Sequence, residues 1–275
     1  MLKQVRHAAE SGTALWEEHW RRFDAIRYDA AALRWDGILD LVDARVEKGR
    51  MLEAGCGLGR YLLYTHARGG DAIGLDFAGE SLARVQHHQP SARVVLGDLT
   101  QLPFRGQTFD TILCLGVVEH FEDGARLPLS QLAAALRPSG WLIVTVPYAN
   151  LLKRRRAARG DTDVVDAGRR VPQGRTFYQY CYTRAEARDL LRDAGLNVIR
   201  DRRISRLFWL LGGRSAHEQA SPARPGVQPR HISSIRGSAL RAVRPLIREG
   251  AYWAQWAIPG DLTSHMIAVV GQKRS

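Results

Sequence analysis

The sequence predicts an α/β fold, namely a doubly wound, mostly parallel seven-stranded sheet with helices on both faces. Short apolar runs alternate with helical patterns over residues 50–146. A glycine-rich segment, Glu53-Ala54-Gly55-Cys56-Gly57-Leu58-Gly59, joins the first run to the first helical pattern, and an acidic residue ends the second run. Such alternation implies parallel strands joined by helices, with ligands bound outside the carboxyl ends of the strands.

The expected strands are short runs rich in aliphatic residues. In chain order they are Arg50–Ala54, Asp71–Asp76, Ala92–Leu96, Phe109–Leu115, Trp141–Val146, Leu196–Ile199 (with an extension to Ile204 left open) and Ser264–Gly271. The fourth is almost continuously apolar, which is typical of a strand buried on both faces. The last follows a long detour, so we expect it to insert into the existing sheet.

The expected helices show apolar residues at three-to-four spacing. Within the alternating region they are Leu58–Ala67, Glu80–Gln89, Leu127–Leu136 and Thr183–Ala194. Thr183 with Glu186 three residues later forms a capping-box pattern, and Gly195 marks the helix end. Residues 13–46 also read as helical, divided at Gly37, and predict an N-terminal helical cap over one face of the domain.

Two stretches break the alternation. Tyr148–Gln179 holds arginine clusters and few apolar residues, which predicts a basic insertion or mobile loop. Residues 205–262 combine an apolar segment, a Pro/Gly/Arg-rich linker and an aromatic helical pattern. They predict a helical or irregular insertion before the last strand.

The glycine spacing narrows the class of ligand. A dinucleotide fingerprint needs glycine at position 60, where Arg60 stands, and the Gly-Lys-Ser/Thr end of a P-loop is absent. Asp76 and Asp98 follow the second and third strands. With these carboxylates at the next two strand ends, the glycine motif becomes a stronger signal for a ligand site.

Together these features resemble the class I, Rossmann-like methyltransferases that use S-adenosylmethionine (SAM), of the small-molecule type. Further matching pieces are Val118–Phe121, Leu136–Trp141 and Thr183–Gly195, and the resemblance covers about Arg50 to Val146. It implies SAM as the cofactor, S-adenosylhomocysteine as the product and an enzyme that methylates an acceptor. The implied division is a cap (1–46), a SAM-binding domain (47–204 with 263–275) and a substrate or interface lobe (205–262).

The resemblance implies one set of residues around the methionine end of SAM. Glu53 would help to hold the ammonium group; alternatively it is only an exposed strand end. Backbone would line the rest of this moiety at Gly55, Cys56, Gly57, Gly59, Leu115 and Gly116.

A second set would bind the nucleoside. Asp76 would accept hydrogen bonds from both ribose hydroxyls, and Phe77 would pack on the adenine. Asp98 would accept from the adenine amino group, with the Leu99 amide facing the ring. The structural alternatives are that Asp76 caps a helix and that Asp98 shapes a turn.

His120 is the candidate general base, because it follows the fourth strand and imidazole can accept a proton near neutral pH. The alternative is that Glu119-His120 only orders a loop. Tyr148, Tyr178, Tyr180 and Tyr182 are candidate acceptor-pocket residues or simple packing residues. No metal site is expected.

Charge and composition bear on partners and compartment. Residues 1–150 hold 16 Lys+Arg against 18 Asp+Glu, whereas the remainder holds 24 against 10. The basic second half fits an anionic partner or a merely solvated surface. Three widely spaced cysteines indicate a reducing compartment, and the cytoplasm is expected.

A small-molecule acceptor, methylated at a hydroxyl oxygen, is the favoured substrate. Nucleic acid is less favoured, because no Asn-Pro-Pro-Tyr-like tetrad follows the fourth strand, where Leu115-Gly116-Val117-Val118 stands. Residues 207–211 and 252–256 suggest peripheral membrane contact, a roof over the pocket or a homodimer contact. A non-catalytic SAM-binding or nucleotide-binding scaffold is the remaining alternative.

Overall fold

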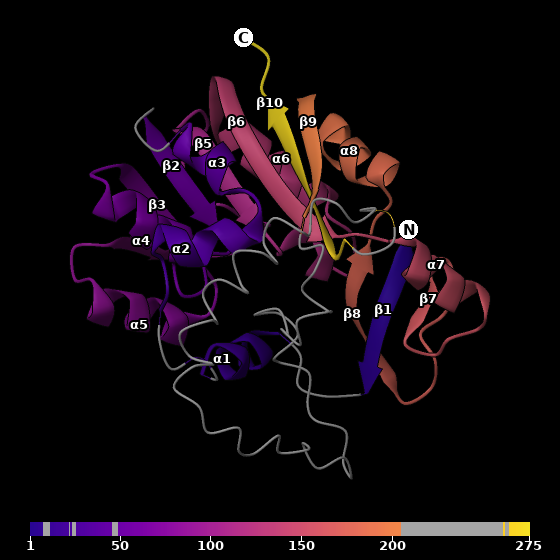
Figure 1. The fold of residues 1–275 in the computed structure, drawn as a ribbon. Helices are drawn as coiled ribbons and strands as arrows, with labels where there is room; N and C mark the ends of the chain where they lie inside the picture. Colours follow the sequence, from indigo (N-terminus) through magenta and orange to yellow (C-terminus); the bar gives the residue numbers. More distant parts are fainter. Residues whose placement is uncertain (8–11, 22, 24–25, 46–48, 205–260, 262–263) are drawn as a thin grey trace, which may run out of the picture.

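A computed structural model describes residues 1–7, 12–21, 23, 26–45, 49–204, 261 and 264–275 (Figure 1). Its central sheet has seven strands in the order β4-β3-β2-β5-β6-β10-β9. Their bounds are β2 Arg50–Ala54, β3 Asp71–Asp76, β4 Arg93–Leu96, β5 Phe109–Leu115, β6 Leu136–Pro147, β9 Asn197–Ile204 and β10 Met266–Gln272. The predicted strands are therefore confirmed, and β6 begins earlier than expected.

The last strand inserts into the sheet as predicted. β10 pairs with both β6 and β9, antiparallel in each case, with Ala268 opposite Thr145 and Arg202. The pairs β2·β3, β2·β5, β3·β4 and β5·β6 are parallel. The mostly parallel, doubly wound sheet is confirmed.

Helices cover both faces of this sheet. They are α4 Arg60–Ala67, α5 Gly79–His88, α6 Arg126–Ala135 and α8 Arg184–Asp193. One core cluster gathers α6 and α8 residues such as Leu132 and Leu191, and the other gathers α4 and α5 residues such as Leu62 and Val85. Thr183 and Glu186 form the predicted capping box at the start of α8.

The N-terminal helical cap is present but segmented. It comprises α1 Thr13–Arg21, α2 Ala30–Leu33, the 3₁₀ helix η1 Arg34–Asp36 and α3 Leu39–Asp43. Gly37 ends η1 with φ +75°, in the left-handed region, and so divides the segment where predicted. Leu33 and Val42 pack in the same core as α4. Figure 1 shows α1 apart from the others, below the central sheet.

A second, three-stranded sheet corrects the expectation of an irregular basic insertion. β1 Leu2–His7 lies between β7 Val164–Asp166 and β8 Arg175–Cys181, antiparallel to both. Helix α7 Leu151–Ala158 precedes β7, and the Asn150 side chain caps it by accepting from Lys153 N at 2.9 Å. Figure 1 shows this sheet beside the main one. The Tyr148–Gln179 stretch thus contains a helix and two strands rather than only irregular chain.

The proposed lobe at 205–262, with its suggested contacts at 207–211 and 252–256, lies outside the described residues apart from Asp261. The division into three parts stays a prediction. Within the described residues, no helix is long and apolar enough to cross a bilayer.

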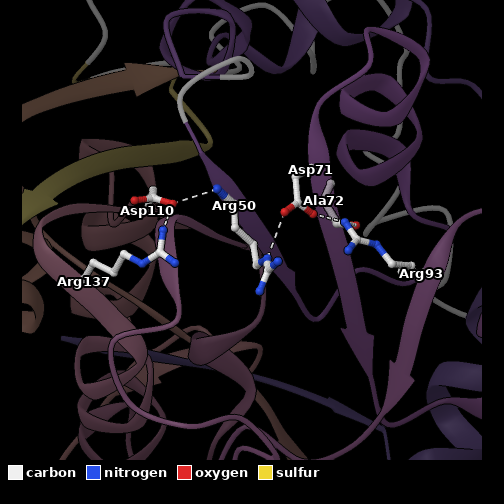
Figure 2. A network of polar contacts seen from close by, with 6 residues as sticks. All are labelled: Arg50, Asp71, Ala72, Arg93, Asp110 and Arg137. Atoms are coloured by element: carbon white, nitrogen blue, oxygen red, sulfur yellow. Dashed lines mark hydrogen bonds and ion pairs between the residues drawn. The ribbon is translucent and has the colours of Figure 1, made fainter.

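Hydrogen bonds and ion pairs between charged residues connect the amino ends of the strands (Figure 2). This is the edge of the sheet opposite the candidate site. Asp110, in β5, accepts from Arg50 N at 2.8 Å and from Arg137 Nη1 at 2.6 Å. Asp71 pairs with the Arg50 Nε at 2.9 Å and also with Arg93. The network connects five neighbouring strands, from β4 to β6, so its role is to hold their register.

Replacing Asp110 by asparagine is expected to lower the free energy of unfolding by about 1 kcal/mol, because charge-assisted hydrogen bonds weaken. Partial burial would raise the pKa of Asp110. The hydrogen bonds from Arg137 and Arg50 together have the larger effect, so the pKa is lowered. The wild-type advantage should therefore be present at neutral pH and disappear as pH falls through this lowered pKa. Urea unfolding at several pH values measures it. Asp189→Asn, in an exposed pair with Arg192, should change little.

Candidate functional site

The glycine segment forms a tight turn between β2 and α4. Gly55, Gly57 and Gly59 have φ angles of +72°, +50° and +65°, which residues other than glycine rarely adopt. A Cβ on Gly55 would lie 2.5 Å from a Val117 methyl carbon. The Cys56 side chain is buried, which leaves only its backbone for a ligand. The turn therefore brings bare backbone to the sheet edge, where a ligand can approach closely.

Asp76, at the end of β3, binds this turn directly. Its carboxylate accepts from Gly57 N at 2.7 Å and from Ala78 N at 2.9 Å. The side chain is 5% exposed. Burial raises its pKa, against the opposing effect of the bonds from Ala78 and Gly57. The ligand-binding interpretation fits, because each carboxylate oxygen can accept more than one hydrogen bond. The capping alternative does not hold, since Ala78 is the N-cap of α5 and no side chain caps this helix.

Glu53 is not the exposed strand end that we considered. It is 5% exposed, and its carboxylate accepts from Leu62 N at 2.7 Å and Tyr61 N at 3.4 Å. Burial raises its pKa to about 7 despite these bonds. Gly59 has no side chain with which to cap α4, so Glu53 satisfies that helix start. Its predicted contact with an ammonium group stays a prediction.

The nucleoside-binding candidates lie on the ends of β3 and β4. Phe77 is 40% exposed, as suits a ring that packs on a ligand. Asp98 is exposed and accepts from Thr100 N at 2.8 Å, the turn contact that we considered as its alternative role. The Leu99 side chain is buried in the core, which leaves only its backbone for a ligand.

The end of β5 supplies the opposite side of the site. Leu115 ends the strand, and Gly116 has φ +70° and donates from its N to Thr145 O at 3.0 Å. The chain then enters the 3₁₀ helix η2, Val118–His120. The structure thus brings the predicted residues of β2, β3 and β5 to one edge of the sheet.

His120 is held between the main domain and the second sheet. Its Nδ1 lies 2.8 Å from Tyr178 O. A carbonyl can only accept, so this contact assigns the proton to Nδ1 and the basic lone pair of the neutral ring to Nε2. The rings of Trp16 and Tyr178 meet the imidazole edge-to-face at centroid distances of 4.7 and 5.1 Å. This tautomer serves both candidate roles, because it lets Nδ1 donate to the carbonyl of β8 and leaves Nε2 as the possible base.

The four candidate tyrosines divide into two groups. Tyr148, Tyr180 and Tyr182 are 5%, 7% and 3% exposed, so packing accounts for them. Tyr178 is less buried and contacts the imidazole. It is therefore the tyrosine best placed to meet an acceptor.

Two tryptophans of α1, which the helical spacing predicts as packing residues, contact the candidate site. A Cβ on Gly57 would run into the ring of Trp20, so that ring lies directly on the glycine turn. Trp16, one helical turn earlier, contacts His120. Arg84 of α5 fixes the end of α1 by donating to Trp20 O at 2.5 Å. The i, i+4 spacing of the tryptophans predicted a shared face, but not what it covers.

Glu119 is a buried carboxyl beside His120. It is 1% exposed, and its Oε2 forms no hydrogen bond to any described residue. Burial raises its pKa to about 8, with the nearby Lys153 opposing the rise. Burial thus favours the uncharged form of this carboxyl. No group of three or more His, Cys, Asp or Glu able to hold a metal occurs among the described residues.

Comparison with known proteins agrees with this arrangement. Residues 52–144 match the model of a family described as a methyltransferase domain. The biotin biosynthesis bifunctional protein BioHC of Cellvibrio japonicus is 32% identical over 153 residues, covering 54% of this chain and 29% of that protein. A probable tRNA methyltransferase 9B of Mus musculus is 28% identical over 135 residues, covering 48% and 29%. The matched part thus spans under a third of each relative.

Comparison with solved structures also agrees with this fold. Phosphoethanolamine N-methyltransferase 2 of Haemonchus contortus, solved in complex with SAM, superposes with a TM-score of 0.58 at 16% identity, covering 96% of this chain and 57% of that one. The domain match covers the glycine turn, Asp76 and His120. This chain contains a Rossmann-like, class I methyltransferase domain of the SAM-dependent type.

Proposed function

We propose that this protein transfers a methyl group from SAM to a hydroxyl oxygen of a small-molecule acceptor, with His120 as general base. The observation that carries the proposal is the position of α1. Its Trp20 lies on the glycine turn and its Trp16, one turn away, lies on His120. A helical turn rises only about 5.4 Å, so the base lies close to the donor site.

The residues of the turn fit SAM. A Cβ on Gly55 or Gly57 would clash with the side chain of Val117 or Trp20, so the turn keeps its shape only with bare backbone at these positions. We propose that Asp76 binds the ribose and Phe77 the adenine, with Asp98 and the Leu99 amide at the base edge. Glu53 would act on the ammonium group from behind the turn, since it is bound to the start of α4.

Bound SAM would supply a methyl group on a positively charged sulfur, which an aligned nucleophile can attack in line. His120 Nε2 would accept the acceptor's hydroxyl proton as the oxygen–carbon bond forms and the carbon–sulfur electron pair returns to sulfur. The Tyr178 carbonyl keeps Nδ1 protonated and so keeps Nε2 basic. Trp16 and Tyr178 hold the ring on both sides, which limits its reorientation.

The enclosure of His120 supports a small acceptor. α1 and β8 both contact the imidazole, which leaves little room there for a bulky polymer. Nucleic acid is the second candidate, favoured by the basic second half and by the similarity to a protein described as a tRNA methyltransferase. We further propose a cytoplasmic location. Homodimerisation is left to measurement.

Calorimetric titration with SAM and S-adenosylhomocysteine tests the donor. Transfer of a labelled methyl group to panels of hydroxylated small molecules, amines and RNA tests the acceptor. Micromolar SAM binding with label on a small hydroxyl compound is expected. Absence of binding at millimolar SAM would contradict the whole proposal, whereas label on RNA or on nitrogen would contradict only the acceptor.

Replacing Trp20 by alanine should weaken SAM binding about tenfold, because a large aromatic surface over the glycine turn is lost. Trp20→Phe should retain most of the affinity. Titration calorimetry measures the SAM affinity of both variants. Leu127→Ser, at an exposed leucine away from the turn, serves as the control. Tighter binding by Trp20→Ala would mean instead that the ring obstructs the cofactor.

A further inference from the structure

The outer side of α7 is a basic surface with one exposed leucine. The helix turns Lys153 and Ala157 inward, where Ala157 packs on the small core of the second sheet. Leu152, Arg155 and Arg159 follow the spacing i, i+3, i+7 on the opposite side, and Leu152 is 53% exposed. We call Leu152, Arg154, Arg155 and Arg159 the α7 face; all four are exposed.

The charge of the α7 face is not neutralised locally. Residues 151–175 hold eight Lys+Arg against three Asp+Glu. Within the described part of the chain, Arg155 and Arg159 form no ion pair, although neighbouring Arg156 pairs with Asp161. Elsewhere carboxylates pair with Arg21, Arg50, Arg60, Arg93, Arg137, Arg184, Arg188, Arg192, Arg202 and Arg203. No carboxylate of the described residues therefore occupies the guanidinium groups of Arg155 and Arg159, which favours an external anion as their partner.

We propose that the α7 face docks on an anionic lipid surface. Guanidinium groups bind phosphate through paired hydrogen bonds, and each basic residue near such a surface strengthens association about fivefold. The exposed Leu152 favours lipid over nucleic acid as the partner of the α7 face. An exposed leucine among arginines adds nothing to contacts with a phosphate backbone, whereas helices that lie in a membrane interface insert this residue type between headgroups.

The position of α7 relates the proposed membrane contact to the candidate functional site. The helix begins directly after Asn150, three residues beyond the end of β6, at the same edge of the sheet as the glycine turn and His120. Asn150 fixes this start, since it caps α7 and also donates to Ser264 O at 3.0 Å. Docking would therefore hold the catalytic edge near a bilayer. The inference goes beyond methyl transfer and does not depend on it.

Flotation of the full chain with vesicles tests the proposal. We expect binding to vesicles of phosphatidylcholine mixed with an equal amount of phosphatidylglycerol, and little binding to phosphatidylcholine alone. The double variant Arg155→Gln/Arg159→Gln should bind the anionic vesicles about 30-fold less tightly. Leu152→Ser should lose about tenfold, and its remaining binding should weaken with salt. Arg105→Gln, at another exposed arginine that forms no ion pair with a described residue, should match the wild type.

Circular dichroism and SAM affinity should be unchanged in all these variants, because the substituted side chains are exposed and lie outside the cofactor-binding set. Equal vesicle binding by the wild type and the double variant would overturn the proposal. So would Leu152→Ser with full affinity. RNA binding that the double variant loses, with vesicle binding retained, would assign the α7 face to nucleic acid instead.

Discussion

Replacing Asp76 by asparagine should weaken SAM binding about 100-fold. The carboxylate accepts hydrogen bonds at both oxygens, from Gly57 N and Ala78 N. An asparagine must direct its NH₂ group at one of these donors, and it removes the charge that would favour two ribose hydroxyls. Hydrogen bonds to charged groups contribute about 1.5–3 kcal/mol each, so one or two lost bonds give this effect. Calorimetric titration measures it.

The matched control is Asp98→Asn, an exposed carboxylate at the neighbouring strand end, for which a loss of about tenfold is expected from one bond. Thermal unfolding without ligand separates binding from folding, because Asp76 also ties the glycine turn to β3. If Asp76→Asn unfolds normally and binds SAM like the wild type, the assignment of Asp76 to the ribose is wrong.

The pH dependence gives a second test of Asp76. Burial raises its pKa, so the carboxyl takes up a proton at a higher pH than an ordinary aspartate. SAM affinity should therefore fall as the pH is lowered through that raised pKa. Glu53, with a pKa of about 7, also loses charge in this direction. The difference between wild type and Asp76→Asn isolates the contribution of Asp76, since both proteins keep Glu53.

The parts of the fold that follow from local pattern were predictable. Arg50–Ala54, Asp71–Asp76 and Phe109–Leu115 have the predicted bounds, because buried parallel strands are rich in aliphatic residues. The capping box at Thr183 is equally local. These elements alone place the glycine turn and Asp76 at one edge.

The second sheet was not predictable in the same way. β1 pairs with β8 across more than 160 residues, with Leu2 opposite Cys181, and nothing in Leu2–His7 identifies so distant a partner. The aromatic alternation of Arg175–Cys181 was a strand signal that the surrounding arginines obscured. The tautomer of His120 depends on that sheet through the Tyr178 carbonyl, and so could not be inferred from the sequence.

The burial of Glu53 and the contacts of α1 were also not predictable from the sequence, because both depend on how helices pack in the folded chain. Glu53 reads as a strand end in the sequence, yet α4 folds back over it and its first turn donates two hydrogen bonds to the carboxylate. Trp16 and Trp20 read as core residues on one helix face. Their contacts with His120 and Gly57 follow from where α1 packs, which a spacing pattern does not specify.

Replacing His120 should reduce kcat by about 10²–10⁴-fold while leaving the SAM dissociation constant nearly unchanged, because general-base catalysis acts on the acceptor rather than on the donor. Two substitutions separate chemistry from packing. His120→Asn keeps a side-chain donor for Tyr178 O, and His120→Phe keeps a ring against Trp16. Neither retains the basic Nε2, so both should be slow in turnover of the acceptor that labelled-methyl transfer identifies.

The pattern across these variants decides the role of His120. If only His120→Phe is slow, the imidazole orders the loop through its Nδ1 bond to Tyr178, and alignment of donor and acceptor supplies the rate. If both are slow and added imidazole restores turnover to His120→Ala, the missing function is a proton acceptor. Full activity in both would mean that the acceptor loses its proton to another group. Because Nδ1 is already committed to a carbonyl, we expect the second pattern.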